Sequence, residues 1–270
     1  GYQTGIFGKW HLGDEDAYLP NRRGFDEVFI HGAGGIGQTY PGSGGDAPNN
    51  SYWDPWIWHN DKFEKTSGYC TDVFFDQAAR WISEPRQKPF LAWISPNVPH
   101  APHVSPGEEW EAPYLKAGLS KSEVLYYAMI AHLDAAVGRL LDHLENESLL
   151  ENTLIIFMTD NGHSVGSLFN AGMRAAKGSP YQGGIRVPSF WSWPGRIPTD
   201  VDCPALTAHV DFLPTIAELA GQPVPDNLDG RSLLPLLKDP KAAWADRLIF
   251  THVGRWEAGD SASAQYRAAA

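Results

Sequence analysis

Sulfur-containing residues are scarce in this chain of 270 residues, which has two cysteines, Cys70 and Cys203, and three methionines. The two cysteines lie far apart and lack the spacing of metal ligands, which argues against a cysteine-based zinc or iron–sulfur centre. A disulfide between them stays open, but we expect two buried free thiols. Two cysteines do not indicate a cellular compartment.

Basic residues are also few, with 21 Lys and Arg against 32 Asp and Glu and a net charge of −11. This balance argues against a nucleic acid partner, because binding to phosphate backbones depends on Lys and Arg. An anion can still bind where cations are concentrated locally. No uninterrupted apolar run approaches the roughly 20 residues that span a bilayer, so we expect no membrane span. The chain opens on Gly1 without an initiator methionine or a signal peptide, and we expect the natural N-terminus to lie upstream.

Apolar residues make up 43% of the chain, and 27 glycines and 21 prolines divide it into short segments. This composition suits one large domain or two small ones. The hydrophobic pattern predicts strands at residues 4–8, 27–30, 90–95, 154–159, 187–193 and 248–252. It predicts helices at residues 71–84, 120–144, 210–220 and 232–237. Strands that alternate with helices predict an α/β fold with a largely parallel sheet and helices on both faces.

The helix that begins at Ser120 has the strongest pattern in the chain. Ser120 and Glu123 form a capping-box signature. Apolar residues then recur at helical spacing, which predicts a stripe facing the core: Tyr126, Ile130, Leu133, Val137, Leu140 and Leu144. A coiled coil is the alternative, but the repeat is too short to favour it.

Residues 31–68 are predicted to form a long loop, and loops of this length are usually functional or insertions. The loop is rich in aromatic residues. They are candidates for a platform that stacks on a sugar ring, or else they pack the loop onto the core: Tyr52, Trp53, Trp56 and Trp58.

The apolar run Leu154–Thr159 ends abruptly at Asp160, Asn161 and Gly162, which suits a buried strand of a parallel sheet. In open α/β sheets, ligands bind beyond the carboxyl ends of strands. Asp160 and Asn161 both offer oxygen atoms to a hard cation, and Lys177 follows within loop distance to neutralise an anion near that cation. The alternative is an ordinary Asp-Asn-Gly turn.

Two other polar motifs directly follow predicted strands, and in a parallel sheet all three motifs would lie along one edge. Lys9 and His11 are two residues apart and face the same way in an extended chain, so they can bind one anion or form a solvated strand end. His100 lies between prolines that restrict its backbone, and it could donate to an ester oxygen or be an ordinary loop histidine. His103 follows as a weaker candidate.

Two further residues are candidates for substrate contact. His163 and Arg174 lie in the predicted loop between the Asp160 motif and Lys177. Both side chains can donate hydrogen bonds to an anionic or hydroxylated substrate.

These segments together resemble the type I sulfatases of the alkaline phosphatase superfamily. The stretch Phe7–Gly13 resembles the second signature of that family, and Thr159–Gly162 resembles its metal-binding strand end. Further matches follow in the family's order at residues 177–188, 211–216 and 228–232. The resemblance covers nearly the whole chain.

The resemblance implies an alkaline phosphatase-like fold and a hydrolase of sulfate esters that uses calcium, with magnesium less expected, and a formylglycine nucleophile. It implies that Asp160 and Asn161 are metal ligands and that Lys9 and Lys177 hold the sulfate group. His11 would act as a base on the formylglycine hydrate, and His100 would protonate the leaving alcohol.

The chain departs from the family at the nucleophile. The family's Cys or Ser followed two residues later by Pro, and then by a small residue and Arg, does not occur, and the sequences after Cys70 and Cys203 do not fit it. The paired aspartates of the family's N-terminal part are also absent. We therefore expect a chain truncated at both ends, with residues 1–250 the central part of the catalytic domain and residues 251–270 the start of a truncated C-terminal region. Such a fragment is expected to be inactive alone.

The expected partners are a sulfated small molecule or sulfated carbohydrate and a formylglycine-generating enzyme, in a secreted or periplasmic location. One alternative is a phosphomonoesterase, phosphodiesterase or phosphonate hydrolase of the same superfamily. Another is a non-catalytic relative that binds anions.

Overall fold

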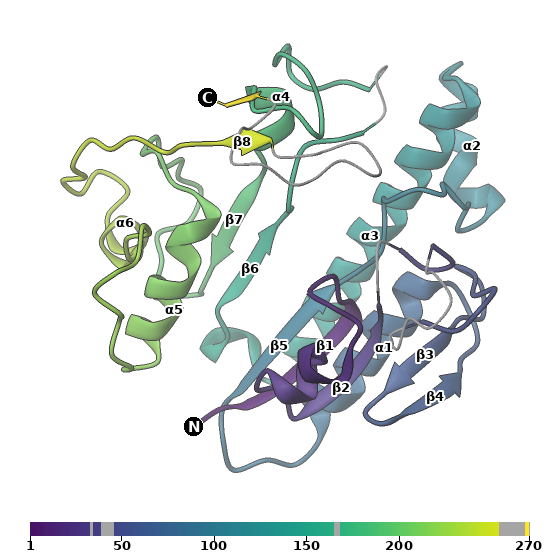
Figure 1. Cartoon of the computed structure of the whole chain (residues 1–270), viewed down its shortest axis with the longest axis horizontal. Coiled ribbons are helices and arrows are strands. Elements are labelled where there is room, and N and C mark those ends of the chain that lie inside the picture. The colour runs from purple at the N-terminus through teal and green to yellow at the C-terminus, as the bar shows by residue number, and fades with distance from the viewer. Residues whose placement is uncertain (33–34, 39–45, 165–167, 254–267, 270) are drawn as a thin grey trace. The chain divides into compact units, whose positions relative to one another are not determined.

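The computed structural model describes residues 1–32, 35–38, 46–164, 168–253 and 268–269. The chain divides into two compact units, Gly1–Ser148 and Leu149–Ala270. In Figure 1 the first unit runs from purple to blue-teal and the second from teal to yellow.

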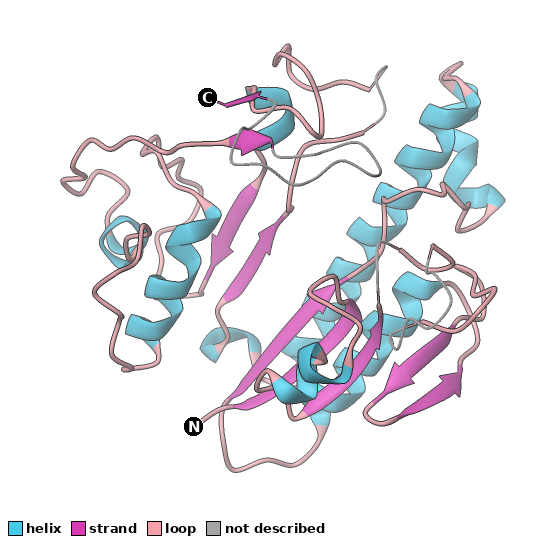
Figure 2. Cartoon of the chain, viewed as in Figure 1, coloured by secondary structure: helices cyan, strands magenta, loops and turns pink. Residues whose placement is uncertain are grey.

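The first unit is built on a sheet of five strands in the order β4-β3-β2-β1-β5. The strands are β1 (Gln3–Lys9), β2 (Glu27–His31), β3 (Trp56–His59), β4 (Lys62–Lys65) and β5 (Phe90–Ser95). Strands β2, β1 and β5 are parallel, whereas β3 and β4 are added antiparallel at one edge. Helix α1 (Cys70–Ser83) connects β4 to β5 and packs against β1 and β5 (Figure 2). The three parallel strands, with α1 packed on β1 and β5, confirm the prediction of parallel strands covered by a helix.

Both faces of β1 and β2 are buried, because apolar residues occupy successive positions in each strand. Ile6, Val28 and Ile30 form a buried cluster on one face, together with Trp10. On the other face, residues one position along contact α1, and the rings of Phe7 and Trp81 lie 5.6 Å apart. Double-sided burial of this kind is typical of parallel strands.

The prediction of one long loop over residues 31–68 is wrong, because the described part of this range contains the hairpin of β3 and β4. Asn60 adopts a positive φ of 56° at the turn, a conformation that asparagine tolerates well. Trp58 and Phe63 pair across the two strands with ring centroids 5.0 Å apart. Helix α2 (Glu108–Lys116) was also not predicted, because Pro113 interrupts its pattern.

Helix α3 (Lys121–Asn146) is confirmed, and the backbone N–H of Ser120 donates to Glu123 Oε2 at 2.9 Å. The predicted apolar stripe is only partly right, since Ile130 is 37% exposed. The buried side chains lie on an adjacent stripe of the helix surface. They include the small residues Ala128 and Ala136, which allow close packing. By length and composition alone α3 is long and apolar enough to cross a membrane, but core helices pass the same test, and α3 packs against α1 and α2.

The second unit contains strand β6 (Ile155–Met158), paired with β7 (Ser189–Ser192). The strand predicted at 187–193 is confirmed as β7, and its pairing with β6 is antiparallel. Residues 155–158 are half-buried rather than fully buried. The remaining elements are short: 3-10 helix η3 (Leu150–Asn152), α4 (Gln182–Ile185), η4 (His209–Asp211), α5 (Phe212–Leu219), α6 (Leu234–Lys238), β8 (His252–Val253) and β9 (Ala268–Ala269). The predicted strand at 248–252 therefore begins only at its last residue, while residues 254–267 lie outside the described part.

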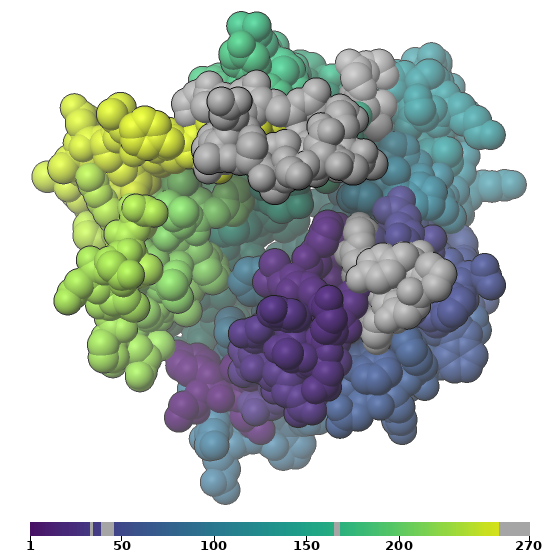
Figure 3. Space-filling view, in the orientation of Figure 1, coloured from purple at the N-terminus to yellow at the C-terminus, as the bar shows by residue number. Residues whose placement is uncertain are grey.

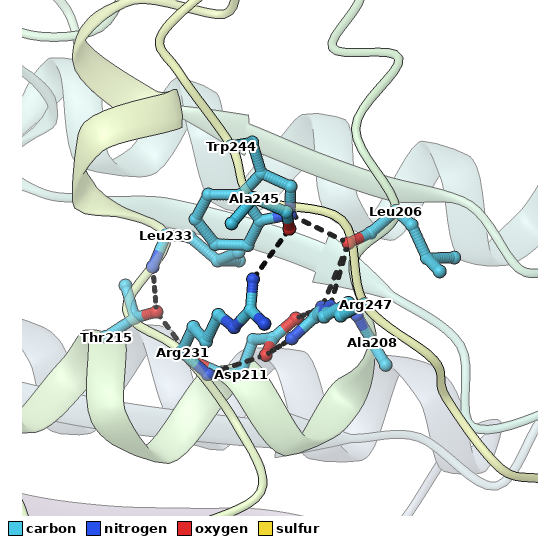
Figure 4. Close-up of polar contacts among 9 residues, drawn as sticks. All are labelled: Leu206, Ala208, Asp211, Thr215, Arg231, Leu233, Trp244, Ala245 and Arg247. Carbon is cyan, nitrogen blue, oxygen red and sulfur yellow. Dashed lines mark hydrogen bonds and ion pairs between the residues drawn. The ribbon is translucent and has the colours of Figure 1, made fainter.

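A buried carboxylate ties the C-terminal segments of the second unit together (Figure 4). Asp211 is fully buried and accepts hydrogen bonds from the backbone N–H groups of Ala208 and Arg231, each at 2.8 Å. Arg247 donates from Nη1 to Asp211 Oδ1 at 2.7 Å and from Nη2 to Oδ2. Burial alone would raise the pKa of Asp211, but the hydrogen bonds from Arg247 and from the backbone hold it below its usual value. Residues 211–216 and 228–232, two segments that resemble the sulfatase family, are thus joined at Asp211, which forms an ion pair with Arg247.

Both cysteines are free thiols. Cys70 is buried at the start of α1, as expected, and burial is the main cause that raises its pKa. Cys203 is exposed, so the expectation of a second buried thiol is wrong.

Candidate active site

The first group of candidate residues lies where β1 and β5 end side by side. Lys9 is the last residue of β1, and its carbonyl oxygen accepts a hydrogen bond from Ser95 Oγ at 2.8 Å. A Cβ atom on Gly8 would lie 2.2 Å from the carbonyl oxygen of Ser95, and Gly8 has a φ of 118°. Only glycine permits this close approach of the two strand ends, so Gly8 positions Lys9.

Four basic side chains converge at these strand ends. Lys9 is Cα partner to His31 in the parallel register of β1 and β2, and the N–H of Trp10 donates to the carbonyl oxygen of His31 at 2.8 Å. His31 is fully buried, and burial is the main cause that lowers its pKa to about 3. The positive charges of Lys9, His100 and His11 lower it further, whereas the Gly32 carbonyl opposes the shift. Lys9, His11 and His100 therefore all lie near His31, a residue that the sequence analysis did not single out.

The ring of His100 is held by its own loop. Nδ1 lies 2.7 Å from the carbonyl oxygen of Ala101, so Nδ1 carries a proton and donates it there. Its own carbonyl oxygen accepts a hydrogen bond from the Tyr52 hydroxyl at 2.8 Å. In the neutral ring, Nε2 is then the nitrogen that carries the lone pair. His103 instead packs edge-on against Tyr126, and burial lowers its pKa.

The aromatic residues of the first unit divide between packing and exposure. Tyr52 is buried, which contradicts its place in a sugar platform, and Trp58 packs against the core cluster and Phe63. Trp53 and Trp56 remain 45% and 42% exposed. N-terminal residues of the first unit, coloured purple, form part of the face seen in Figure 3.

In the second unit, glycines bring the Asp160 motif against the segment around Lys177. The N–H of Gly162 donates to the carbonyl oxygen of Gly184 at 2.9 Å, and the N–H of Lys177 donates to the carbonyl oxygen of His163 at 2.9 Å. A Cβ atom on Gly162 would lie 1.9 Å from the carbonyl oxygen of Gly183. These contacts require residues without side chains, which explains why two glycine-rich motifs occur together.

The predicted site residues of the second unit are therefore neighbours through the backbone. Asp160 and Lys177 are exposed, while Asn161 is half-buried. Both ring nitrogens of His163 are shielded from solvent and have no hydrogen-bond partner among the described residues. The guanidinium of Arg174 stacks on Tyr181, 3.7 Å from the ring centroid.

The donor atoms of Asp160 and Asn161 suit a hard cation such as calcium, because both offer oxygen. Two donors are only part of a calcium site, which takes roughly 6–8 oxygens. Among the described residues, no group of three or more His, Cys, Asp or Glu side chains could hold a metal ion. These two residues fit the cation as part of a larger set of ligands.

The comparisons with known proteins agree with these motifs. The family profile described as Sulfatase matches residues 1–222. The chain belongs to the sulfatase family. Arylsulfatase A of Homo sapiens is 30% identical over 270 residues, covering 88% of this chain and 49% of that protein. Arylsulfatase G of Mus musculus is 30% identical over 311 residues, covering 98% of this chain and 56% of that protein.

A solved structure shares the fold. The structure of Ps i-CgsB in complex with k-i-k-neocarrahexaose has a TM-score of 0.84 and 29% identity, covering 94% of this chain and 59% of that one. The α/β, alkaline phosphatase-like fold predicted for this sulfatase is thereby confirmed. The chain spans about half the length of the curated relatives it matches.

Proposed function

We propose that the full-length protein hydrolyses sulfate esters with a formylglycine nucleophile and calcium. The observation that supports this most is the convergence of Lys9, His11 and His100 at adjoining strand ends in a member of the sulfatase family. Cations fixed around a transferring anionic group stabilise the charge that develops in the transition state. A structural protein of this fold would not need them there.

Each residue of the chain has a task in this proposal. Lys9 and Lys177 bind the oxygens of the sulfate group and offset its charge. His100, with Nδ1 fixed on Ala101, delivers the proton on Nε2 to the leaving alcohol oxygen. His11, which is exposed, accepts a proton when sulfate is released. His163 and Arg174 contact the rest of the substrate.

Asp160 and Asn161 would hold the calcium ion through their side-chain oxygens. When bound, calcium polarises the sulfate oxygens, and the formylglycine supplies the attacking oxygen. Maturation would then depend on a formylglycine-generating enzyme, in a secreted or periplasmic setting.

The proposed substrate class is sulfated carbohydrate. The support is the complex of Ps i-CgsB with an oligosaccharide, since that protein is 29% identical to this one with a TM-score of 0.84. Exposed Trp53 and Trp56 offer faces on which a sugar ring can stack.

The test is made on the full-length protein, produced together with a formylglycine-generating enzyme. Asp160→Ala should abolish turnover of an aryl sulfate and remove the rise in melting temperature that calcium causes in the parent. Asp202→Ala, an exposed carboxylate of the same unit, is the matched control and should change neither. Faster turnover of phosphate or phosphonate esters than of sulfate esters by the parent would instead favour the phosphoesterase alternative.

A further inference from the structure

His31 is the last residue of β2, and the mechanism above gives it no task. Its ring is fully buried on the face of the sheet that α1 covers, with its centroid 6.0 Å from that of Phe74. This position would ordinarily hold an apolar residue. Phe29, two positions earlier, lies on the same face and packs against Phe74 of α1.

Of the two ring nitrogens of His31, only Nδ1 has a hydrogen-bond partner among the described residues. Nδ1 lies 3.0 Å from the carbonyl oxygen of Gly32, so Nδ1 carries the proton and donates it. Burial keeps the imidazole neutral, which leaves a lone pair on Nε2. Nε2 is buried and has no hydrogen-bond partner among the described residues.

The neighbours of His31 are donors. The register of β1 and β2 places Lys9 directly beside His31, and side chains of paired residues leave the same face of a sheet. The charges of His100 and His11 also reach the ring. Asn97, which follows β5 and is 2% exposed, has neither side-chain amide atom hydrogen-bonded among the described residues. The end of the sheet therefore offers several polar groups of the kind that a buried water needs as partners.

We propose that His31 is a positioning residue for Lys9, whose ammonium donates to the Nε2 lone pair of His31 through a single buried water. A neutral acceptor directs the ammonium without cancelling the charge that Lys9 needs to hold the sulfate group. A carboxylate at this position would pair with Lys9 and offset that charge. This inference rests on the proposed function, because it assigns a role within the same site.

A buried acceptor without a partner destabilises a fold, so its presence calls for an explanation. If the lone pair serves Lys9, replacing the ring with an apolar ring should stabilise the protein and slow the reaction together. A purely structural histidine would not link these two effects. The experiment therefore measures whether a variant gains thermal stability and loses activity at the same time.

The test uses three variants of the full-length protein with an aryl sulfate as substrate. His31→Gln keeps an acceptor close to the Nε2 position, whereas His31→Asn keeps only a group close to Nδ1. We expect Asn to lower kcat by about tenfold to a hundredfold with little change in KM, by analogy with residues that orient catalytic groups. Gln should restore most of that loss. His31→Phe should match Asn in rate and have a melting temperature above that of the parent.

A second measurement shows whether the effect passes through Lys9. In a Lys9→Ala background, His31→Asn should change the rate by less than about twofold, because coupled residues are not additive. Equal rates for the parent, Gln, Asn and Phe proteins would overturn the proposal, and so would an Asn effect that is undiminished without Lys9. If Phe does not fold, the comparison of Gln with Asn decides alone. An inactive parent would refute the proposed function instead, and the two failures are thus distinguishable.

Discussion

Removal of the Asp211 carboxylate should be among the most destabilising single changes in the second unit. The side chain of Asp211 is fully buried, that of Arg247 is 6% exposed, and the carboxylate accepts two backbone hydrogen bonds besides the two from Arg247. Asp211→Ala leaves the guanidinium buried without its counter-charge, which costs about 3–5 kcal/mol. The melting temperature should then fall by on the order of 10 °C, as followed by calorimetry or circular dichroism.

The matched control is an ion pair on the surface. Arg22 and Asp16 lie 3.5 Å apart with side chains 55% and 79% exposed, so Asp16→Ala should leave the melting temperature nearly unchanged. In addition, Asp211→Leu combined with Arg247→Met should be milder than Asp211→Ala, because no buried charge remains unpaired. If Asp211→Ala and Asp16→Ala lower the melting temperature equally, the reasoning about burial is wrong.

The same carboxylate makes a prediction about pH. The pKa of Asp211 is lower in the folded protein than in the unfolded chain, where it is about 3.9. The ionised carboxylate of Asp211 therefore makes its full contribution to the free energy of unfolding at a pH above the unfolded pKa. This contribution is lost as the pH falls through the folded pKa. The difference in melting temperature between the parent and Asp211→Asn should be constant from pH 7 to about pH 5 and should shrink below about pH 4. A difference that grows on acidification would contradict the assignment.

Three further predictions concern the site. Lys9→Ala and Lys177→Ala should each lower the rate of the full-length enzyme by about 10²–10³, as for loss of one preorganised donor; an unchanged rate would remove that lysine from the site. His100→Ala should slow hydrolysis of sugar sulfates far more than that of nitrophenyl sulfate, and an equal loss on both would indicate binding rather than proton donation. Gly162→Ala should lower the melting temperature, because the added Cβ meets the Gly183 carbonyl, whereas Gly138→Ala, with open space around it, should not.

The spacing of apolar residues predicted most helices and strands of the first unit, because this spacing reflects which side chains are buried. Strands β1, β2 and β5 and helices α1 and α3 all follow from apolar spacing. The hairpin of β3 and β4 was missed although Asn60 and Asp61 form a two-residue turn between alternating residues, a signal that was available. Helix α2 also left a trace, since acidic residues occupy its first turn and Lys116 its last.

Strand direction and contacts between distant residues could not be predicted from short stretches of the sequence. The antiparallel direction of β7 depends on how the chain returns after α4, which hydrophobic spacing does not encode. Asp211 and Arg247 pair across 36 positions, and nothing near Arg247 marks it as buried. His31 escaped notice because it is a single polar residue at the end of the apolar strand β2 and no second polar residue follows it closely. The third parallel strand end was nevertheless predictable as a place for a polar residue.

The exposed edge of the first sheet has a consequence for the behaviour of the protein in solution. Strand β4 is exposed along its whole length and carries Lys62, Glu64 and Lys65, with the Lys65 ammonium over the Trp56 ring at 5.7 Å. Charged side chains on an outer strand discourage a second chain from adding its own strand there. The charges on β4 therefore oppose edge-to-edge pairing of this strand with a second copy of the chain.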